Sequence, residues 1–185
     1  THRILGADKG HVCLLSADGK VEWQAPCWGG THDLTLLPNG NILFPTSPHE
    51  IVEMTPDKKI VWRYDSKPKA PYSGPIEVHA FQRLDNGLTM IAESGNKRII
   101  EVDKDGKIQK EIALVVDHPH PHRDTRMARK LSNGHYLVCH EADATVREYD
   151  EKGKVVWSHT LDLAGRPRAD GHGPEGHGTE VYGAL

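Results

Sequence analysis

The chain is rich in histidine, the side chain that most often binds metals and that exchanges protons near neutral pH. It has 13 histidines but only 2 phenylalanines. Two segments concentrate them: VVDHPHPHRDTR at 115–126 and ADGHGPEGHGTE at 169–180. Their prolines and glycines predict shaped loops rather than strands. We therefore expect two loops that present imidazoles to a ligand.

A repeated sequence motif places further candidate residues at equivalent positions. Asn-Gly pairs stand at 39–40, 86–87 and 133–134, so the interval is 47 residues both times. The residues eight positions before these glycines are His32, His79 and Arg126. The matching place in the last segment is Glu180. A repeat of this length indicates an array of one supersecondary unit, so these four positions should be equivalent.

The pattern within one unit alternates between apolar and polar residues, which predicts strands. LTLLP, NILFPTS, EIVEMTP and KIVWRYD give four short strands separated by turns. Asn-Gly between such runs is a strong hairpin signal, in which both turn residues take positive φ. Four antiparallel strands in each unit predict an all-β fold, a β-propeller of four-stranded antiparallel blades.

A second phrase, ADGKVEW at 17–23 and EKGKVVW at 151–157, resembles the tryptophan-docking repeat of PQQ-like (quinoprotein-like) propellers. The phrase around the Asn-Gly pairs is similar to repeats of arylsulfotransferase-like propellers. We expect Trp23, Trp62 and Trp157 to fill the gaps between neighbouring sheets. Lys110 stands where the third unit should have tryptophan. No quinone-ligating cluster is recognisable, so PQQ is not expected.

The repeat predicts a single propeller domain with about four blades in this chain. We expect these blades to be part of a six- to eight-bladed ring; the alternative is a four-bladed ring closed by strand exchange. The predicted parts are a partial blade at 1–31, blades at 32–78, 79–125 and 126–176, and an innermost strand at 177–185.

The innermost strand of each blade lines the channel of a propeller, so one end of the channel should gather side chains from every blade. The predicted ligand-binding residues are His32, His79, His122, Arg123, Arg126, His177 and Glu180. Three interpretations remain open for them. They are a transition-metal site, an anion site, or histidines with hydrogen-bonded structural roles. The residues predicted for the metal are His32, His79, His122 and His177.

The function predicted on these grounds is that of an exported propeller that binds a ligand at a channel mouth lined by histidine and arginine. One alternative is an enzyme that uses a channel histidine, either for the sulfuryl transfer that the arylsulfotransferase resemblance implies or for hydrolysis. Another alternative is a scaffold that binds other proteins. The expected partner is thus a small anion, a metal or another protein.

The overall composition excludes two classes of partner. The net charge is −3 and no face is obviously basic, so nucleic acid is not expected. No apolar run approaches the roughly 20 residues of a membrane helix. The chain begins with Thr1, and we expect processing and a secreted or periplasmic location. In that compartment Cys13 and Cys27 could form a disulfide; otherwise both, with Cys139, are buried thiols.

Overall fold

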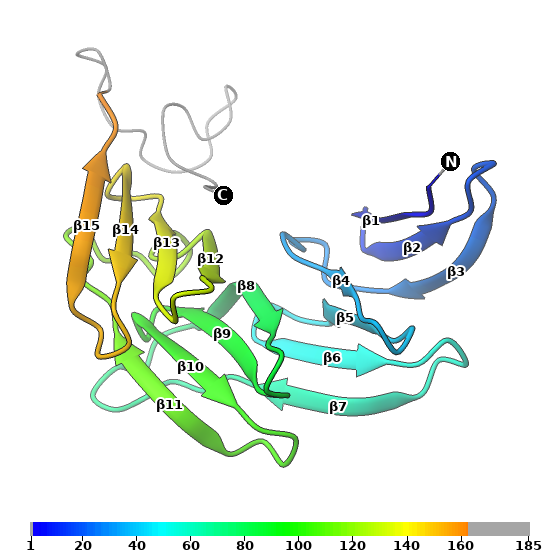
Figure 1. The fold of residues 1–185 in the computed structure, drawn as a ribbon, viewed down its shortest axis with the longest axis horizontal. Coiled ribbons are helices and arrows are strands. Elements are labelled where there is room, and N and C mark those ends of the chain that lie inside the picture. The colour runs from blue at the N-terminus through cyan, green and yellow to red at the C-terminus, as the bar shows by residue number, and fades with distance from the viewer. Residues whose placement is uncertain (1, 163–185) are drawn as a thin grey trace.

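The structure is a computed structural model that describes residues 2–162. Its strands form four antiparallel sheets that follow one another around an open arc (Figure 1). The all-β prediction is confirmed. The described residues contain no helix, and so none that is long and apolar enough to cross a membrane.

Each sheet is built from strands that are consecutive in the chain. The first has three strands, β1 (Ile4–Asp8), β2 (His11–Leu15) and β3 (Val21–Pro26). The second contains β4 (Thr35–Leu36), β5 (Ile42–Pro45), β6 (Glu50–Met54) and β7 (Ile60–Asp65). The third contains β8 (Glu77–Arg83), β9 (Thr89–Ser94), β10 (Arg98–Val102) and β11 (Ile108–Ala113). The fourth contains β12 (Met127–Lys130), β13 (Tyr136–His140), β14 (Thr145–Tyr149) and β15 (Val155–Thr160).

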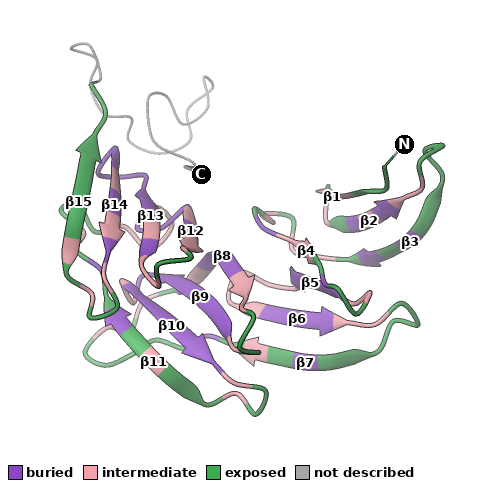
Figure 2. Cartoon of the chain, in the orientation of Figure 1, coloured by how far each residue is buried: buried purple, intermediate pink, exposed green. Residues whose placement is uncertain are grey.

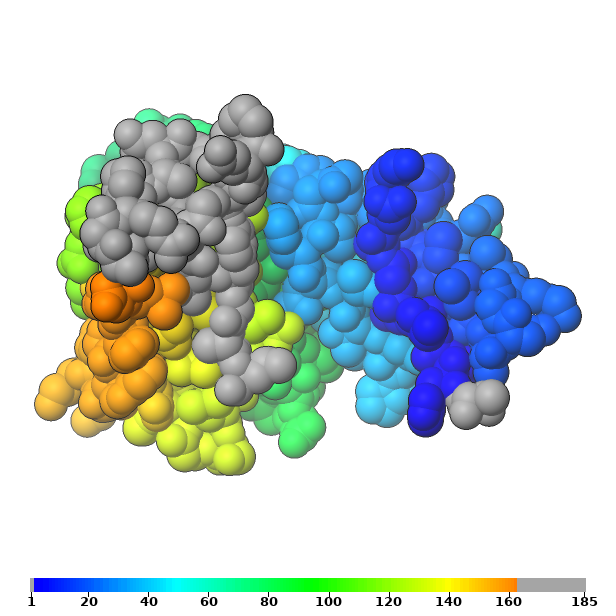
Figure 3. Space-filling model, turned by 90° about the horizontal axis from the view of Figure 1, so that it is seen from above, coloured from blue at the N-terminus to red at the C-terminus, as the bar shows by residue number. Residues whose placement is uncertain are grey.

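The strands β4, β8 and β12 lie on the concave side of the arc, and β3, β7, β11 and β15 lie on its outer side (Figure 1). The middle strands of the second and third sheets are buried almost throughout, whereas the outer strands are largely exposed (Figure 2). Seen from above, the first sheet and the fourth stand at opposite ends of the molecule (Figure 3). Each cluster of buried apolar side chains joins two neighbouring sheets, so the core lies between the sheets.

Large side chains at one repeated position fill these gaps. Trp23 of the first sheet packs edge-on against Phe44 of the second, with ring centroids 6.1 Å apart. The indole of Trp62 donates a hydrogen bond to the carbonyl of Asp103 in the third sheet. Lys110, which takes the tryptophan position in the third sheet, places its ammonium 5.5 Å from the ring centroid of Tyr136. A cation–π contact thus replaces the indole at the third gap.

The described residues do not test the prediction for Trp157, because they contain no sheet beyond β15. This side chain is 50% exposed, whereas Trp23 and Trp62 are each 8% exposed. Trp157 lies on β15, and no other sheet of the described chain packs against its outer face. Its ring stacks instead on His159 of the same strand.

The Asn-Gly turns fall where they were predicted, but their conformation differs from the prediction. Only the glycines have positive φ, at 83°, 85° and 86° for Gly40, Gly87 and Gly134. The asparagine side chain instead accepts a hydrogen bond from the backbone N–H two residues later, as Asn39 does from Asn41. Such an Asx turn stabilises the corner locally, so the asparagine does not need positive φ.

The cysteines are free thiols. Cys139 is buried, and Cys13 and Cys27 are half-buried. The structure therefore contains no bridge between Cys13 and Cys27.

The turns before the outermost strands give a stability prediction. Gly19, Gly106 and Gly153 have φ near 80° there, but the second unit places Lys58 at the same corner with φ 65°. Because a left-handed conformation costs a non-glycine residue roughly 1–2 kcal/mol, Lys58→Gly should raise the free energy of unfolding by about 1 kcal/mol. The matched change Gly106→Lys meets no atom within 4 Å and should lower it by a similar amount. Urea denaturation measures both; equal stability of Lys58→Gly and wild type would contradict the assignment of strain.

Candidate functional site

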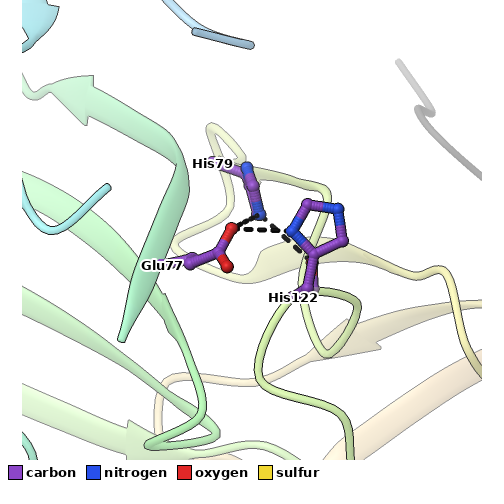
Figure 4. Close-up of side chains that lie close together, drawn as sticks. All are labelled: Glu77, His79 and His122. Atoms are coloured by element: carbon purple, nitrogen blue, oxygen red, sulfur yellow. Dashed lines mark hydrogen bonds and ion pairs between the residues drawn. The ribbon is translucent and has the colours of Figure 1, made fainter. Parts of the chain in front are cut away.

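Three segments of the chain come together around the start of β8. They are the start of β8, the loop from β11 to β12, and the loop before β4. Glu77, His79 and His122 lie together there, with one ligand atom from each residue within 4.8 Å of the others (Figure 4). Carboxylate and imidazole are a ligand set that zinc and several other transition metals accept.

A β-bulge directs His79 into this cluster. In the pairing of β8 with β9, Val78 opposes Glu93 and Ala80 opposes Ala92, so His79 is the extra residue. An extra residue on one strand breaks the alternation of faces and turns a side chain out of its regular direction. His79 lies in one site with Glu77, and its side chain is fully buried.

Glu77 is the charged centre of the site. Its Oε2 lies 2.7 Å from Nδ1 of His122 and 3.2 Å from Nε2 of His79. Burial raises the pKa of Glu77, but hydrogen bonds and charge from the two histidines outweigh this effect and lower the pKa to about 2. The carboxylate is therefore ionised at neutral pH.

The Nε2 atom of His79 has contacts that no single proton can satisfy. It lies 3.2 Å from the Glu77 carboxylate and 3.1 Å from the backbone carbonyl oxygen of His122, and both of these are acceptors. It also lies 3.3 Å from the NH1 donor of Arg126. A ring nitrogen carries either a proton or a lone pair, so one of these contacts is always unsatisfied. The other nitrogen, Nδ1, is buried and has no hydrogen-bond partner among the described residues.

Arg126 borders the site on its buried side. Its NH1 lies 3.2 Å from Nε2 of His122 as well as near His79, while its Nε lies 2.5 Å from the carboxylate of Glu141. Both partners of this ion pair are nearly inaccessible to solvent. Among the described residues, Glu141 thus offsets the charge of Arg126, and the carboxylate of Glu77 adds a negative charge to the site.

His32 and Trp28 form the outer wall of the site. The rings of His32 and His79 are 4.9 Å apart, and the indole of Trp28 lies 5.7 Å from His79. Trp28 folds over Gly30, where a Cβ atom would come within 2.6 Å of the indole. Burial, followed by the charge of Arg126, lowers the pKa of His32 to about 4. Burial also lowers the pKa of His79, so both imidazoles are neutral at pH 7.

Of the residues suggested by the sequence, the structure brings His32, His79, His122 and Arg126 together. Arg123 lies near His120 instead, where its charge contributes to lowering the pKa of that histidine. His177 and Glu180 lie outside the described residues.

Three residues of the site were missed by the sequence analysis. Glu77 stands two positions before His79 in the same strand, and this spacing was the available signal. Trp28 precedes His32 by four residues in the same loop. Glu141 follows β13, and no sequence pattern connects it with Arg126.

No protein-family model and no curated protein matches this sequence. Similar solved structures exist. A protein of unknown function from Bacteroides caccae has a TM-score of 0.72 and 22% identity, covering 86% of this chain and 58% of its own. A catalytically inactive histidine-to-alanine variant of virginiamycin B lyase from Staphylococcus aureus, with quinupristin, has a TM-score of 0.56 and 17% identity, covering 82% and 49%. The Pan2 WD40 domain of Neurospora crassa has a TM-score of 0.58 and 9% identity, covering 83% and 44%.

The fold is that of a β-propeller. The neighbouring lyase and WD40 domain are propeller-like, and their likeness covers 82% and 83% of this chain. The propeller chain spans about half the length of the structures it matches. Assignment to the PQQ-like or arylsulfotransferase-like propellers stays a prediction.

The low pKa of His32 can be tested by a pH titration followed by NMR. Its ring resonances should shift with a midpoint near pH 4, as should those of buried His140, whose pKa burial also lowers to about 4. The variant His32→Gln identifies which signal is which. A midpoint near the ordinary value of 6.5 would show that His32 does not sit beside Arg126 as described.

The same shifts set the direction in which stability depends on pH. Between pH 6.5 and 4 the unfolded chain takes up a proton at His32 that the folded chain does not, so stability should fall as the pH falls. Protonation of Glu77, with a folded pKa of about 2, should continue this loss below pH 4.5.

Proposed function

We propose that this propeller binds a divalent transition metal ion through Glu77, His79 and His122. The observation that carries the proposal is the convergence of donor atoms at Nε2 of His79. Around this nitrogen lie the Glu77 carboxylate, Nδ1 of His122 and the His122 carbonyl. Protons alone cannot satisfy all of these hydrogen-bonding atoms. A cation between them satisfies every lone pair at once.

The geometry is compatible with zinc. Donor atoms at about 2.1 Å from a tetrahedral zinc ion are about 3.4 Å apart. The Glu77 oxygen lies 3.2 Å from His79 and 2.7 Å from His122, and all three ligand atoms lie within 4.8 Å of one another, so small movements of the side chains bring them around one ion. The neutral imidazole of His79 and the ionised carboxylate of Glu77 are also in the protonation states that metal binding requires. The ionised carboxylate of Glu77 favours a cation.

Zinc binding by the metal-free protein can be measured by isothermal titration calorimetry. Wild type should bind one zinc ion in the site, and Glu77→Gln, which keeps the shape but removes the charge, should weaken binding by about a hundredfold. His122→Ala should do the same.

The matched control is His135→Ala. The Nδ1 atom of His135 also lies 2.7 Å from a glutamate, Glu148, but in the fourth sheet, where His135 directly precedes β13 and Glu148 lies on β14. Its replacement should leave zinc affinity unchanged. Equal affinities of wild type, Glu77→Gln and His122→Ala would refute the proposed site. Trp28 gives a second readout, because cobalt bound beside His79 should quench its fluorescence and Trp28→Phe should remove that signal.

A second candidate function is metal-assisted hydrolysis or group transfer. It is supported by His32, a neutral imidazole on the open side of the cluster that could act as a general base. The lyase among the structural neighbours, which loses activity when a histidine is replaced by alanine, is consistent with such a role but shares only 17% identity.

This candidate predicts turnover by the zinc-loaded protein. Aryl sulfates and carboxylic esters are suitable substrates, and His32→Ala should lose the activity while keeping the zinc. Absence of turnover with all of these substrates would favour a binding role for the site.

A further inference from the structure

We propose that a cavity between the first and second sheets is a further binding site, which takes a small, neutral, apolar molecule that carries a carbonyl group. The cavity has a volume of about 390 Å³, and pockets for small molecules usually have about 300–1,000 Å³. None of the residues of the proposed metal site lines it. Its apolar walls include Leu14, Trp23, Leu36 and Ile42.

Ion pairs cross the equivalent gaps between the other sheets. In the second sheet Glu53 stands opposite Trp62, and it pairs at 2.8 Å with Arg83 of the third sheet. The Cζ atom of Arg83 lies 5.3 Å from the ring centroid of Trp62 and so covers the indole. At the next gap, Glu101 of the third sheet pairs with Lys130 of the fourth. Charged side chains thus occupy the space between the sheets at both places.

At the first gap, leucines take both of these charged positions. Leu14 stands opposite Trp23 in the pairing of β2 with β3, which is the place of Glu53 in the second sheet. Leu36 lies four residues before the glycine of its Asn-Gly turn, which is the place of Arg83 in the third sheet. Leucine is shorter than arginine and has no charge, so the space beside Trp23 stays open and its walls are apolar.

The indole N–H of Trp23 is the polar group that a ligand in this cavity should satisfy. Trp23 is 8% exposed, and its Nε1 is buried with no hydrogen-bond partner among the described residues. The equivalent nitrogen of Trp62 donates to the carbonyl of Asp103 in the next sheet. An indole N–H is a donor only, and a buried donor without an acceptor is costly. A ligand that brings an acceptor removes this cost.

The charges of the cavity select a neutral ligand. Among the described residues that line it, only Arg3 and Glu22 are charged, and Nε of Arg3 donates to the Glu22 carboxylate at 2.7 Å. Because these two charges already pair with each other, a charged ligand would be buried without a counter-charge, which is unfavourable. A ketone, ester or amide instead offers a neutral acceptor for Trp23, and its apolar part can lie between Leu14 and Leu36.

The test follows the indole N–H signals of isotope-labelled, zinc-free protein by NMR during titration with acetophenone. Ethylbenzene, which has a similar shape but no carbonyl group, is the control probe. Acetophenone should move the Trp23 N–H signal downfield as the hydrogen bond forms, and the signal of Trp62, which already donates to Asp103, should stay in place. Trp23→Phe identifies the Trp23 signal.

Two further variants show whether the N–H and the cavity are responsible. In Trp23→Phe, the ratio of acetophenone affinity to ethylbenzene affinity should fall about tenfold, because the ring remains but the donor is lost. Trp62→Phe is the matched control and should leave this ratio unchanged. The double variant Leu14→Glu with Leu36→Arg introduces the ion pair of the second gap, and it should abolish binding of both probes.

The outcomes decide the proposal without reference to the metal site. A downfield shift of the Trp23 signal, together with the fall in the affinity ratio, supports it. No shift of this signal with acetophenone overturns it, as does an equal affinity ratio in wild type and Trp23→Phe. Unchanged binding by the double variant also overturns it, because the probe would then lie outside the cavity.

Discussion

The carboxylate of Asp33 joins three sheets at the centre of the arc, and the site depends on this junction. One of its oxygens accepts the backbone N–H of Phe81 in β8, and both oxygens bind the guanidinium of Arg129 in β12. Asp33 itself lies just before β4, a strand of two residues that the sheet ladder alone would hold weakly. Burial raises the pKa of Asp33, while the pairing with Arg129 opposes this rise and helps to keep the carboxylate charged. His32, His79 and Arg126 each stand one to three residues from a member of this junction.

The repeat made most of the fold predictable. Its spacing identified the strands and turns, because a 47-residue period with alternating apolar residues leaves few other architectures. The same spacing placed His32, His79 and Arg126 at equivalent positions. The local conformation of the Asn-Gly corners was not predictable from the dipeptide. Asparagine can stabilise a turn either by taking positive φ or by accepting a hydrogen bond with its side chain. Here the side chain of Asn39 forms the bond.

Glu77 and Trp28 could not be found in the same way, for two physical reasons. A regular strand would have put Glu77 and His79 on one face but left the direction of that face undetermined. The bulge at His79 decides the direction, and it arises from the pairing with β9 rather than from the sequence of β8. Trp28 is positioned by a backbone hydrogen bond to Pro45 of β5 and by the space over Gly30, both of which exist only in the folded chain.

The chemistry of the molecule gathers where the repeat is broken. The contacts between sheets tolerate exchange of one residue type for another, as the replacement of an indole by Lys110 against Tyr136 demonstrates. Among the inner strands of the described chain, β8 has a bulge in its pairing, whereas β4 and β12 pair in regular register. The loop that carries His122 and the loop before β8 have equivalent places in the repeat. The loop with His122 contains histidines and leads to Arg126, whereas the earlier loop contains lysines and a tyrosine. Repetition supplies the rigid frame, and a single bulge together with one altered loop is sufficient to place a charged, histidine-rich cluster on it.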